Sequence, residues 1–191
     1  MKSGILILPI LLLLLTACEE DAPIPKPPSY LRTELPDHKY NRYVDSCNYQ
    51  FDLPEIYTVE KAPGDTNSDC HRRIQLGPMN GTMYFRYWDM NEPLSYYINN
   101  ANDEVDFHKT KATNIVDLTI MRPEDRVFGT LFRLEGDVAT PFQFYMTDST
   151  DRFVYAEVLF NFAPNYDSLR PTLDYLQQDL EQLMETFQWA P

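Results

Sequence analysis

The stretch from Leu169 to Trp189 carries a single apolar stripe, which restricts the possible folds more than any other part of the chain. Its large apolar side chains follow one another at steps of four, three, four, three, one and three residues: Leu169, Leu173, Leu176, Leu180, Leu183, Met184 and Phe187. That spacing predicts an amphipathic α-helix, with Ser168 as its N-cap residue. Polar side chains cover much of the remaining surface: Asp174, Gln177, Asp179, Glu181 and Glu185. Because such a stripe must be buried, we expect the helix to lie on a β-sheet.

The segments before this helix alternate between apolar and polar residues, as strands with one buried face do. The strongest turn signal is Asn80-Gly81, which predicts a hairpin between His71–Pro78 and Gly81–Met90. Further strands are predicted at residues 49–54, 55–60, 113–121, 126–136, 141–148 and 152–162. The tight links between the later strands favour antiparallel pairing.

One helix interrupts these strands. It starts after Pro93 and is predicted to run from Leu94 to about Lys109, with these side chains on one face: Leu94, Tyr97, Ile98, Ala101, Val105 and His108. The sequence therefore predicts an α+β fold, in which a mainly antiparallel sheet packs with a central helix and the long C-terminal amphipathic helix. This order of elements resembles the Mog1/PsbP-like architecture, a likeness that implies little about function.

The N-terminus has the parts of an export signal: Lys2, then an apolar run from Ile5 to Leu15 that is too short to span a bilayer as a helix. Leu15-Thr16-Ala17-Cys18 resembles the bacterial lipobox, which implies that Cys18 carries acyl chains such as palmitate after cleavage before it. The alternative is an ordinary signal peptide with an incidental cysteine. Three acyl chains would hold the protein to a membrane essentially permanently.

Cys18 is followed by three acids and a proline-rich segment. In some bacteria such acids resemble a signal for sorting lipoproteins to the outer membrane or the cell surface; the alternative is a charged start to a linker. The prolines favour an extended, semi-rigid tether. We therefore expect a signal peptide at residues 1–17, an acylated cysteine with its tether at residues 18–29, and one globular α+β domain at residues 30–191.

The charge balance argues against nucleic-acid binding. The chain has 16 Lys and Arg against 29 Asp and Glu, a formal net charge of −13, and loss of Lys2 with the signal makes this −14. An acidic surface without a basic stripe repels phosphates.

Cys47 and Cys70 are the two cysteines left after lipidation. Beyond the inner membrane, where oxidation is expected, they can form a disulfide, which would close 22 intervening residues and contribute about 3 kcal/mol. The alternative is two free buried thiols.

No motif for catalysis, a metal or a cofactor stands out, so we expect neither enzymatic activity nor a cofactor. The three histidines, His38, His71 and His108, lie in unrelated contexts. The stretch that contains Tyr84, Phe85, Tyr87 and Trp88 is rich in aromatic rings, and Tyr84, Tyr87 and Trp88 are candidates for a partner surface. The alternative is a central strand covered on both faces.

Residues 128–189 resemble the family of GldD gliding motility lipoproteins. The shared features include Gly129, Glu135-Gly136, Pro141–Phe144, Thr147–Thr150, Tyr155–Phe162, Pro164-Asn165, Asp167–Leu169 and Glu185–Trp189. Cys47-Asn48-Tyr49, Phe51, Pro54, Cys70 and the proline-rich start agree as well, whereas residues 101–115 match less clearly.

The resemblance implies a non-catalytic lipoprotein of the cell envelope that is required for gliding and for the associated type IX protein secretion machinery. Its partners would be envelope proteins of that machinery, and its membrane would most simply be the outer membrane. The alternative hypothesis is an envelope lipoprotein that binds or hydrolyses a small ligand at a site assembled only in the fold.

Overall fold

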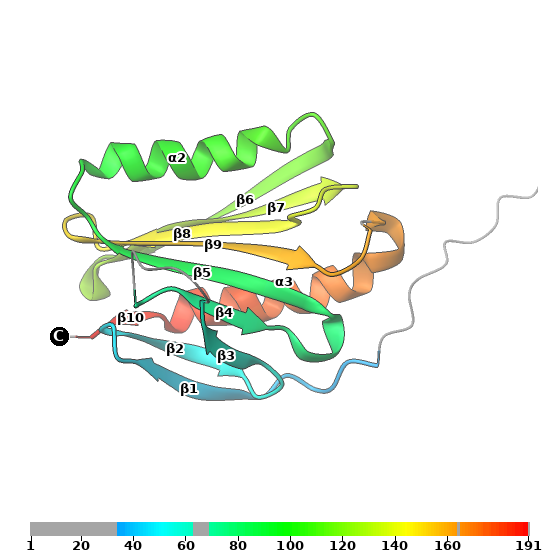
Figure 1. Cartoon of the computed structure of the whole chain (residues 1–191), viewed down its shortest axis with the longest axis horizontal. Helices are drawn as coiled ribbons and strands as arrows, with labels where there is room; N and C mark the ends of the chain where they lie inside the picture. The colour runs from blue at the N-terminus through cyan, green and yellow to red at the C-terminus, as the bar shows by residue number, and fades with distance from the viewer. Residues whose placement is uncertain (1–33, 63–68, 164, 191) are drawn as a thin grey trace, which may run out of the picture.

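Seven antiparallel strands form the main sheet of this computed structural model, which describes residues 34–62, 69–163 and 165–190. Their order across the sheet is β3-β4-β5-β9-β8-β7-β6 (Figure 1). The strands are β3 (Thr58–Lys61), β4 (Arg72–Gln75), β5 (Gly81–Asp89), β6 (Ala112–Arg122), β7 (Val127–Gly136), β8 (Phe142–Thr147) and β9 (Arg152–Phe160). The predicted antiparallel pairing is confirmed, including the β4–β5 hairpin, where Asn80 adopts the left-handed conformation at φ 51°.

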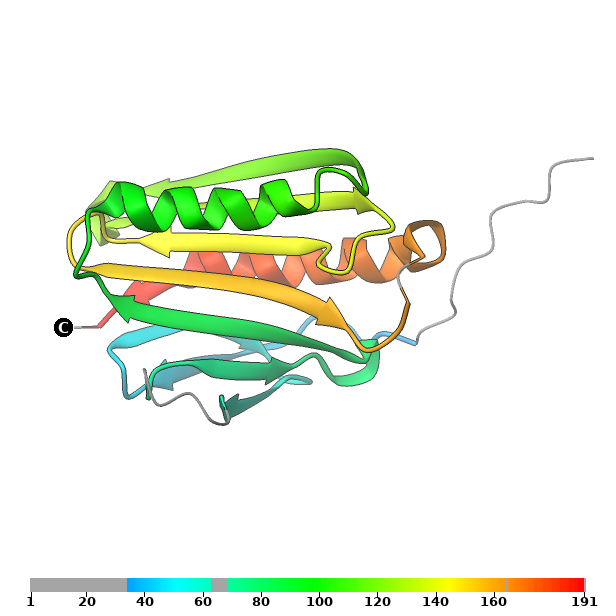
Figure 2. The same ribbon diagram turned by 45° about the horizontal axis from the view of Figure 1, so that its top comes forward.

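Two helices and a smaller sheet cover the faces of the main sheet. Helix α2 (Leu94–Phe107) lies along β8 and β9 on one face (Figure 2). Helix α3 (Tyr166–Thr186) and the smaller sheet pack on the other face. The smaller sheet has the order β1-β2-β10, from β1 (Tyr40–Asp45), β2 (Tyr49–Pro54) and β10 (Gln188–Trp189). The α+β class predicted from the sequence is confirmed.

The main core lies between the main sheet and α3. Strands β8 and β9 direct alternate side chains toward α3: Phe142, Phe144, Met146, Val154, Ala156 and Val158, each at most 1% exposed. The apolar stripe of α3 meets them through Leu173, Leu176, Leu180, Leu183 and Met184, each at most 2% exposed. Burial of each large apolar side chain contributes about 1.5–3 kcal/mol, so this contact stabilises the fold strongly.

The ends of α3 differ from the prediction. Asn165, not Ser168, is the N-cap residue, and its side chain accepts a hydrogen bond from the Ser168 N–H at 3.2 Å. The helix ends at Thr186, whereas the periodicity predicted helix to Trp189. Phe187 is extended, and β10 then pairs with Tyr49–Gln50 of β2. Gln188 and Trp189 gain sheet hydrogen bonds in place of helical ones. Phe187 still lies in the core, which is why the apolar spacing of the sequence runs on past the end of the helix.

Strand β1 was not predicted, because it carries few apolar residues and only Asp45 among its six residues is buried. It forms the edge of the smaller sheet and pairs with β2 over the full length of both strands. Its position therefore depends on backbone pairing and on polar side-chain contacts that join distant segments.

Asp179 forms one of these contacts, and the prediction that it belongs to the solvent-facing side of α3 is wrong. Its side chain is 1% exposed. It accepts hydrogen bonds from the hydroxyls of Tyr57 at 2.6 Å and Tyr40 at 3.0 Å, and lies 2.7 Å from Nδ1 of His38. A buried carboxylate requires such partners. The cluster attaches the start of the described chain to the long helix.

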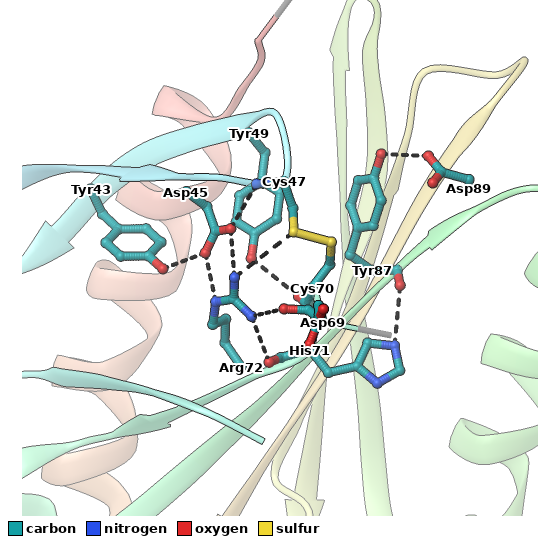
Figure 3. Close-up of a disulfide and its surroundings, with 10 residues drawn as sticks. All are labelled: Tyr43, Asp45, Cys47, Tyr49, Asp69, Cys70, His71, Arg72, Tyr87 and Asp89. Carbon is teal, nitrogen blue, oxygen red and sulfur yellow. Dashed lines mark hydrogen bonds and ion pairs between the residues drawn. A yellow bond between two sulfur atoms is a disulfide. The ribbon is translucent and has the colours of Figure 1, made fainter. Parts of the chain in front are cut away.

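A disulfide joins Cys47, in the β1–β2 turn, to Cys70, just before β4 (Figure 3). The Cα atoms are 5.6 Å apart. The bond links the smaller sheet covalently to the main sheet, and it is the pairing predicted from the sequence.

A buried ion pair lies beside this disulfide (Figure 3). Arg72 donates to both carboxylate oxygens of Asp45, at 2.6 and 2.7 Å, and to two backbone carbonyls. The Tyr43 hydroxyl and the Cys47 N–H also donate to Asp45. Asp45 and Arg72 are 7% and 6% exposed. Water hardly reaches either side chain, so each charge depends on the other for neutralisation.

Replacing both Cys47 and Cys70 with serine should lower the free energy of unfolding by about 3 kcal/mol, because the unfolded chain regains the freedom of the closed loop. Urea unfolding of the purified chain, followed by tryptophan fluorescence, measures this. A reductant should shift the wild-type midpoint to that of the double variant and leave the variant unchanged. Equal midpoints for oxidised wild type and variant would contradict the prediction.

Asp45→Asn should lower the free energy of unfolding at pH 7 by about 3 kcal/mol, because Arg72 would stay buried without its counter-charge. Burial raises the pKa of Asp45, but hydrogen bonds from Arg72, Tyr43 and Cys47 outweigh it, so the net pKa is lowered. The stabilisation is therefore present above the ordinary carboxyl pKa of about 3.9 and is lost as pH falls through the lower folded-state value.

Urea unfolding across this pH range tests the sign: the difference between wild type and Asp45→Asn should shrink toward low pH. The control is Asp52→Asn, whose partner Arg42 is 3.1 Å away in a half-exposed pair. It should cost about 1 kcal/mol or less. A pH-independent difference for Asp45→Asn would contradict the assigned role of the carboxylate.

Candidate functional site

Strand β5 divides the predicted aromatic surface between the two faces of the main sheet. Tyr84 and Trp88 are half-buried on the face that carries α2, with Arg86 between them. Tyr87 points to the opposite face, is 4% exposed and donates its hydroxyl to Asp89 at 2.8 Å. Phe85 lies fully buried beside it. Tyr87 therefore shares no surface with Tyr84 and Trp88. For Tyr87 and Phe85 the alternative interpretation is correct, because both are covered core residues of a central strand.

A groove of about 530 Å³ lies between α2 and the two strands β5 and β9. It exists because α2 covers β8 and β9 but leaves the outer side chains of β5 open beside it. The residues that line it include Arg86, Trp88, Tyr96, Asp103, Glu104 and Tyr155. Trp88 is the one predicted surface residue that lies in this groove; Tyr84 lines a separate hollow with Arg73 and the other side of Arg86.

Packed rings form the floor of the groove. Tyr97 of α2 and Phe153 of β9 have ring centroids 5.3 Å apart, and Trp88 lies 6.4 Å from Phe153. Tyr97 is also fixed by its hydroxyl, which donates to Asn91 Oδ1 at 2.8 Å and accepts from the Asn91 N–H at 3.1 Å. These contacts hold the helix at a fixed distance from the sheet, so the groove is already formed in the free protein.

A chain of buried polar groups runs beneath α2. The Tyr155 hydroxyl donates to Gln143 at 3.0 Å, Gln143 donates to Thr140 at 3.0 Å, and Thr140 Oγ1 lies 2.7 Å from His108 Nε2. Burial lowers the pKa of His108 and outweighs the acids Glu104 and Glu157, which act in the opposite direction. The chain joins the end of α2 to the sheet and supports the groove from below.

The charges at the groove are unequal. Arg86 donates to Glu157 at 2.8 Å, and its guanidinium lies 5.9 Å from the centroid of the Tyr155 ring. Burial raises the pKa of Tyr155, and Glu157 and Glu104 raise it further, so the phenol stays neutral. Asp103 and Glu104 have no ion-pair partner in the part of the chain that the structure describes. The groove therefore presents aromatic rings together with two uncompensated negative charges.

Sequence reasoning did not find Tyr96, Asp103 and Glu104 as site residues. They lie on the polar side of α2, and only the position of the helix along β8 and β9 brings them next to Trp88. A usable signal was present in α2 itself: its C-terminal half is acidic and its last turn contains no basic residue.

The other predicted positions lie apart from the groove. Cys47 and Cys70 form the disulfide at the β1–β2 turn, and Cys18 lies outside the described residues. His38 contacts Asp179, whereas His108 lies at the end of α2. Within residues 34–62, 69–163 and 165–190, no three His, Cys, Asp or Glu side chains come together as a potential metal site. No helix in that part of the chain is long and apolar enough to cross a membrane.

Comparison with known proteins identifies the family. A search of curated sequences finds no match. Among solved structures, the chain is similar to cyanobacterial PsbP (CyanoP) from Synechocystis sp. PCC 6803, with 12% identity, a TM-score of 0.46 and coverage of 82% of this chain and 95% of that chain. The model of the family described as gliding motility lipoprotein GldD matches residues 20–189. Since this match spans nearly the whole sequence, the chain belongs to the GldD family of gliding motility lipoproteins.

Proposed function

We propose that this lipoprotein supports gliding motility and the associated type IX protein secretion machinery as a non-catalytic component that acts through contacts with envelope proteins. The observation that carries the proposal is the family match over residues 20–189. The preformed groove at α2 supports a binding role, because tryptophan, tyrosine and arginine are the side chains that contribute most often to protein interfaces.

The attachment to the membrane is part of the same proposal. Residues 1–17 would be removed, Cys18 would carry the acyl chains, residues 18–29 would form the tether, and residues 30–191 would form the domain. We place the protein at the outer membrane, on the basis of the acids that follow Cys18. The net charge of −14 for the mature chain favours protein partners over nucleic acid.

Two observations favour the alternative of a ligand-binding or hydrolytic protein. The groove has the volume of a small-molecule site, and a second cavity of about 550 Å³ borders Tyr175, whose ring stacks on His38 at 3.9 Å. His38 contacts the buried Asp179, an arrangement that orients catalytic imidazoles in some enzymes. In the described part of the chain, however, no serine, threonine or cysteine is hydrogen-bonded to His38. Turnover of a substrate by the purified chain, lost in His38→Gln, would favour this alternative.

Deletion of the gene in the native host should abolish colony spreading and deplete proteins released into the medium, because both would depend on the same machinery. Spreading assays and electrophoresis of the culture medium measure the two effects. The wild-type gene should restore both. Normal spreading with a normal set of secreted proteins would refute the proposal, and spreading lost with intact secretion would restrict the role to motility.

Cys18→Ala should move the protein out of the membrane fraction and abolish labelling by radioactive palmitate, since the acyl chains are the proposed anchor. Membrane sedimentation with immunoblotting gives the distribution. Ile24→Ala, a change in the tether that leaves the cysteine in place, is the control and should stay membrane-bound. Palmitate labelling of the Cys18→Ala variant at the wild-type level would overturn the assignment.

A further inference from the structure

Glu104 lies in the last turn of α2, where the helix itself does not favour an acid, and Asp103 directly precedes it. The C-terminal end of a helix carries a partial negative charge, which repels nearby carboxylates. Asp106, in the same part of α2, is matched by Lys109 at 2.5 Å, but neither Asp103 nor Glu104 has such a partner among the described residues. Proteins break such local preferences mainly at functional sites, so the two acids are candidates for a role outside the helix.

The aromatic side chains of the groove are suited to a cation. Trp88 is half-buried and Tyr96 is 52% exposed, so both keep ring surface available. The faces of such rings attract ammonium and guanidinium groups. The groove already contains one example, because Arg86 lies over the ring of Tyr155 with its charge matched by Glu157. A second cation in the groove would meet the carboxylates of Asp103 and Glu104, which have no ion-pair partner among the described residues, whereas Arg86 already pairs with Glu157.

We propose that this groove binds a lysine or arginine side chain of an extended basic segment in an envelope protein, with Asp103 and Glu104 as the counter-charges and Trp88 and Tyr96 as the aromatic walls. The inference deepens the proposed function, because it specifies the chemistry of the partner contact. Charge complementarity favours this occupant: an anionic ligand would be repelled by both carboxylates, and an uncharged apolar ligand would leave them without a counter-charge.

The rest of the domain favours the same partner. The net charge of the mature chain, −14 with its tether included, attracts basic segments over distances longer than any contact, and this steering weakens as salt is added. The carboxylates at the groove would then fix the segment in one place. The preformed walls require little rearrangement on binding, since the rings of Tyr97 and Phe153 and the hydrogen bonds of Tyr97 and Tyr155 already hold them.

Fluorine NMR of the full chain in detergent micelles, with 5-fluorotryptophan incorporated, tests the binding. The chain has two tryptophans, Trp88 in the groove and Trp189 on the opposite face of the main sheet, so the second resonance is an internal control. The probe is a capped heptapeptide of alternating alanine and arginine, with glutamine in place of arginine for comparison. The basic peptide should shift the Trp88 resonance in a saturable way, and Trp189 should stay unchanged. No saturable shift of Trp88, or equal shifts with the glutamine peptide, would overturn the proposal.

The charges are tested with a matched pair of variants. Asp103→Asn combined with Glu104→Gln removes the two groove carboxylates and should weaken peptide binding at least tenfold, which corresponds to about 1.4 kcal/mol. Asp117→Asn combined with Glu124→Gln removes two exposed acids outside the groove, on β6 and in the short turn Pro123–Asp125, and should stay within twofold of wild type. Equal weakening by both pairs would mean that only the net charge matters and would overturn the site.

The same two variants, placed in the native host, separate this inference from the proposed function. If both hold, the groove variant should lose spreading at normal protein level, while the control variant spreads normally. If the groove variant spreads like wild type although deletion of the gene abolishes spreading, the proposed function stands and the groove is not its partner contact. If deletion has no effect while the peptide still binds at Trp88, the proposed function fails and the binding site remains.

Discussion

The burial of the α3 stripe against one face of the main sheet is the contact on which the rest of the structure depends. Leu176, Leu180 and Leu183 exclude water from that face, in the same core as the inward side chains of β8 and β9. With this face filled by α3 and the smaller sheet, the other face has to be covered by the single helix α2. One helix does not cover seven strands, so the outer side chains of β5 remain accessible next to it.

The parts of the fold that sequence reasoning predicted well are those governed by local periodicity. The α3 stripe and the alternation of Phe142, Phe144 and Met146 follow directly from the residue spacing, and the position of the β4–β5 turn follows from Asn80-Gly81. Alternation along β5 also predicts that Tyr87 and Phe85 point to one face of the sheet and Trp88 to the other. The aromatic density of that strand was the weaker guide, because rings occur on both of its faces.

The parts that could not be predicted depend on contacts between distant segments. Asp179 looks like any surface acid of an amphipathic helix until Tyr40 and Tyr57, more than 120 residues away in the chain, are placed against it. Strand β1 forms because β2 offers a free edge, and its own residues give no apolar signal. The groove is of the same kind: Trp88 and Glu104 become neighbours only when α2 is packed along the sheet. Local patterns determined the elements, whereas the site arose from their assembly.

The Asp179 cluster also has a mechanical meaning. A force applied to the chain ahead of residue 38 meets the packing of Leu35 on the core and then His38 and Tyr40, whose side chains contact the same carboxylate of α3. Because these contacts lie at or before the start of β1, tension acts on the 21-residue helix α3 before it can separate β1 from β2. Because the apolar stripe of α3 is buried in the main core, a pull that acts through Asp179 loads the core as well as the edge strand.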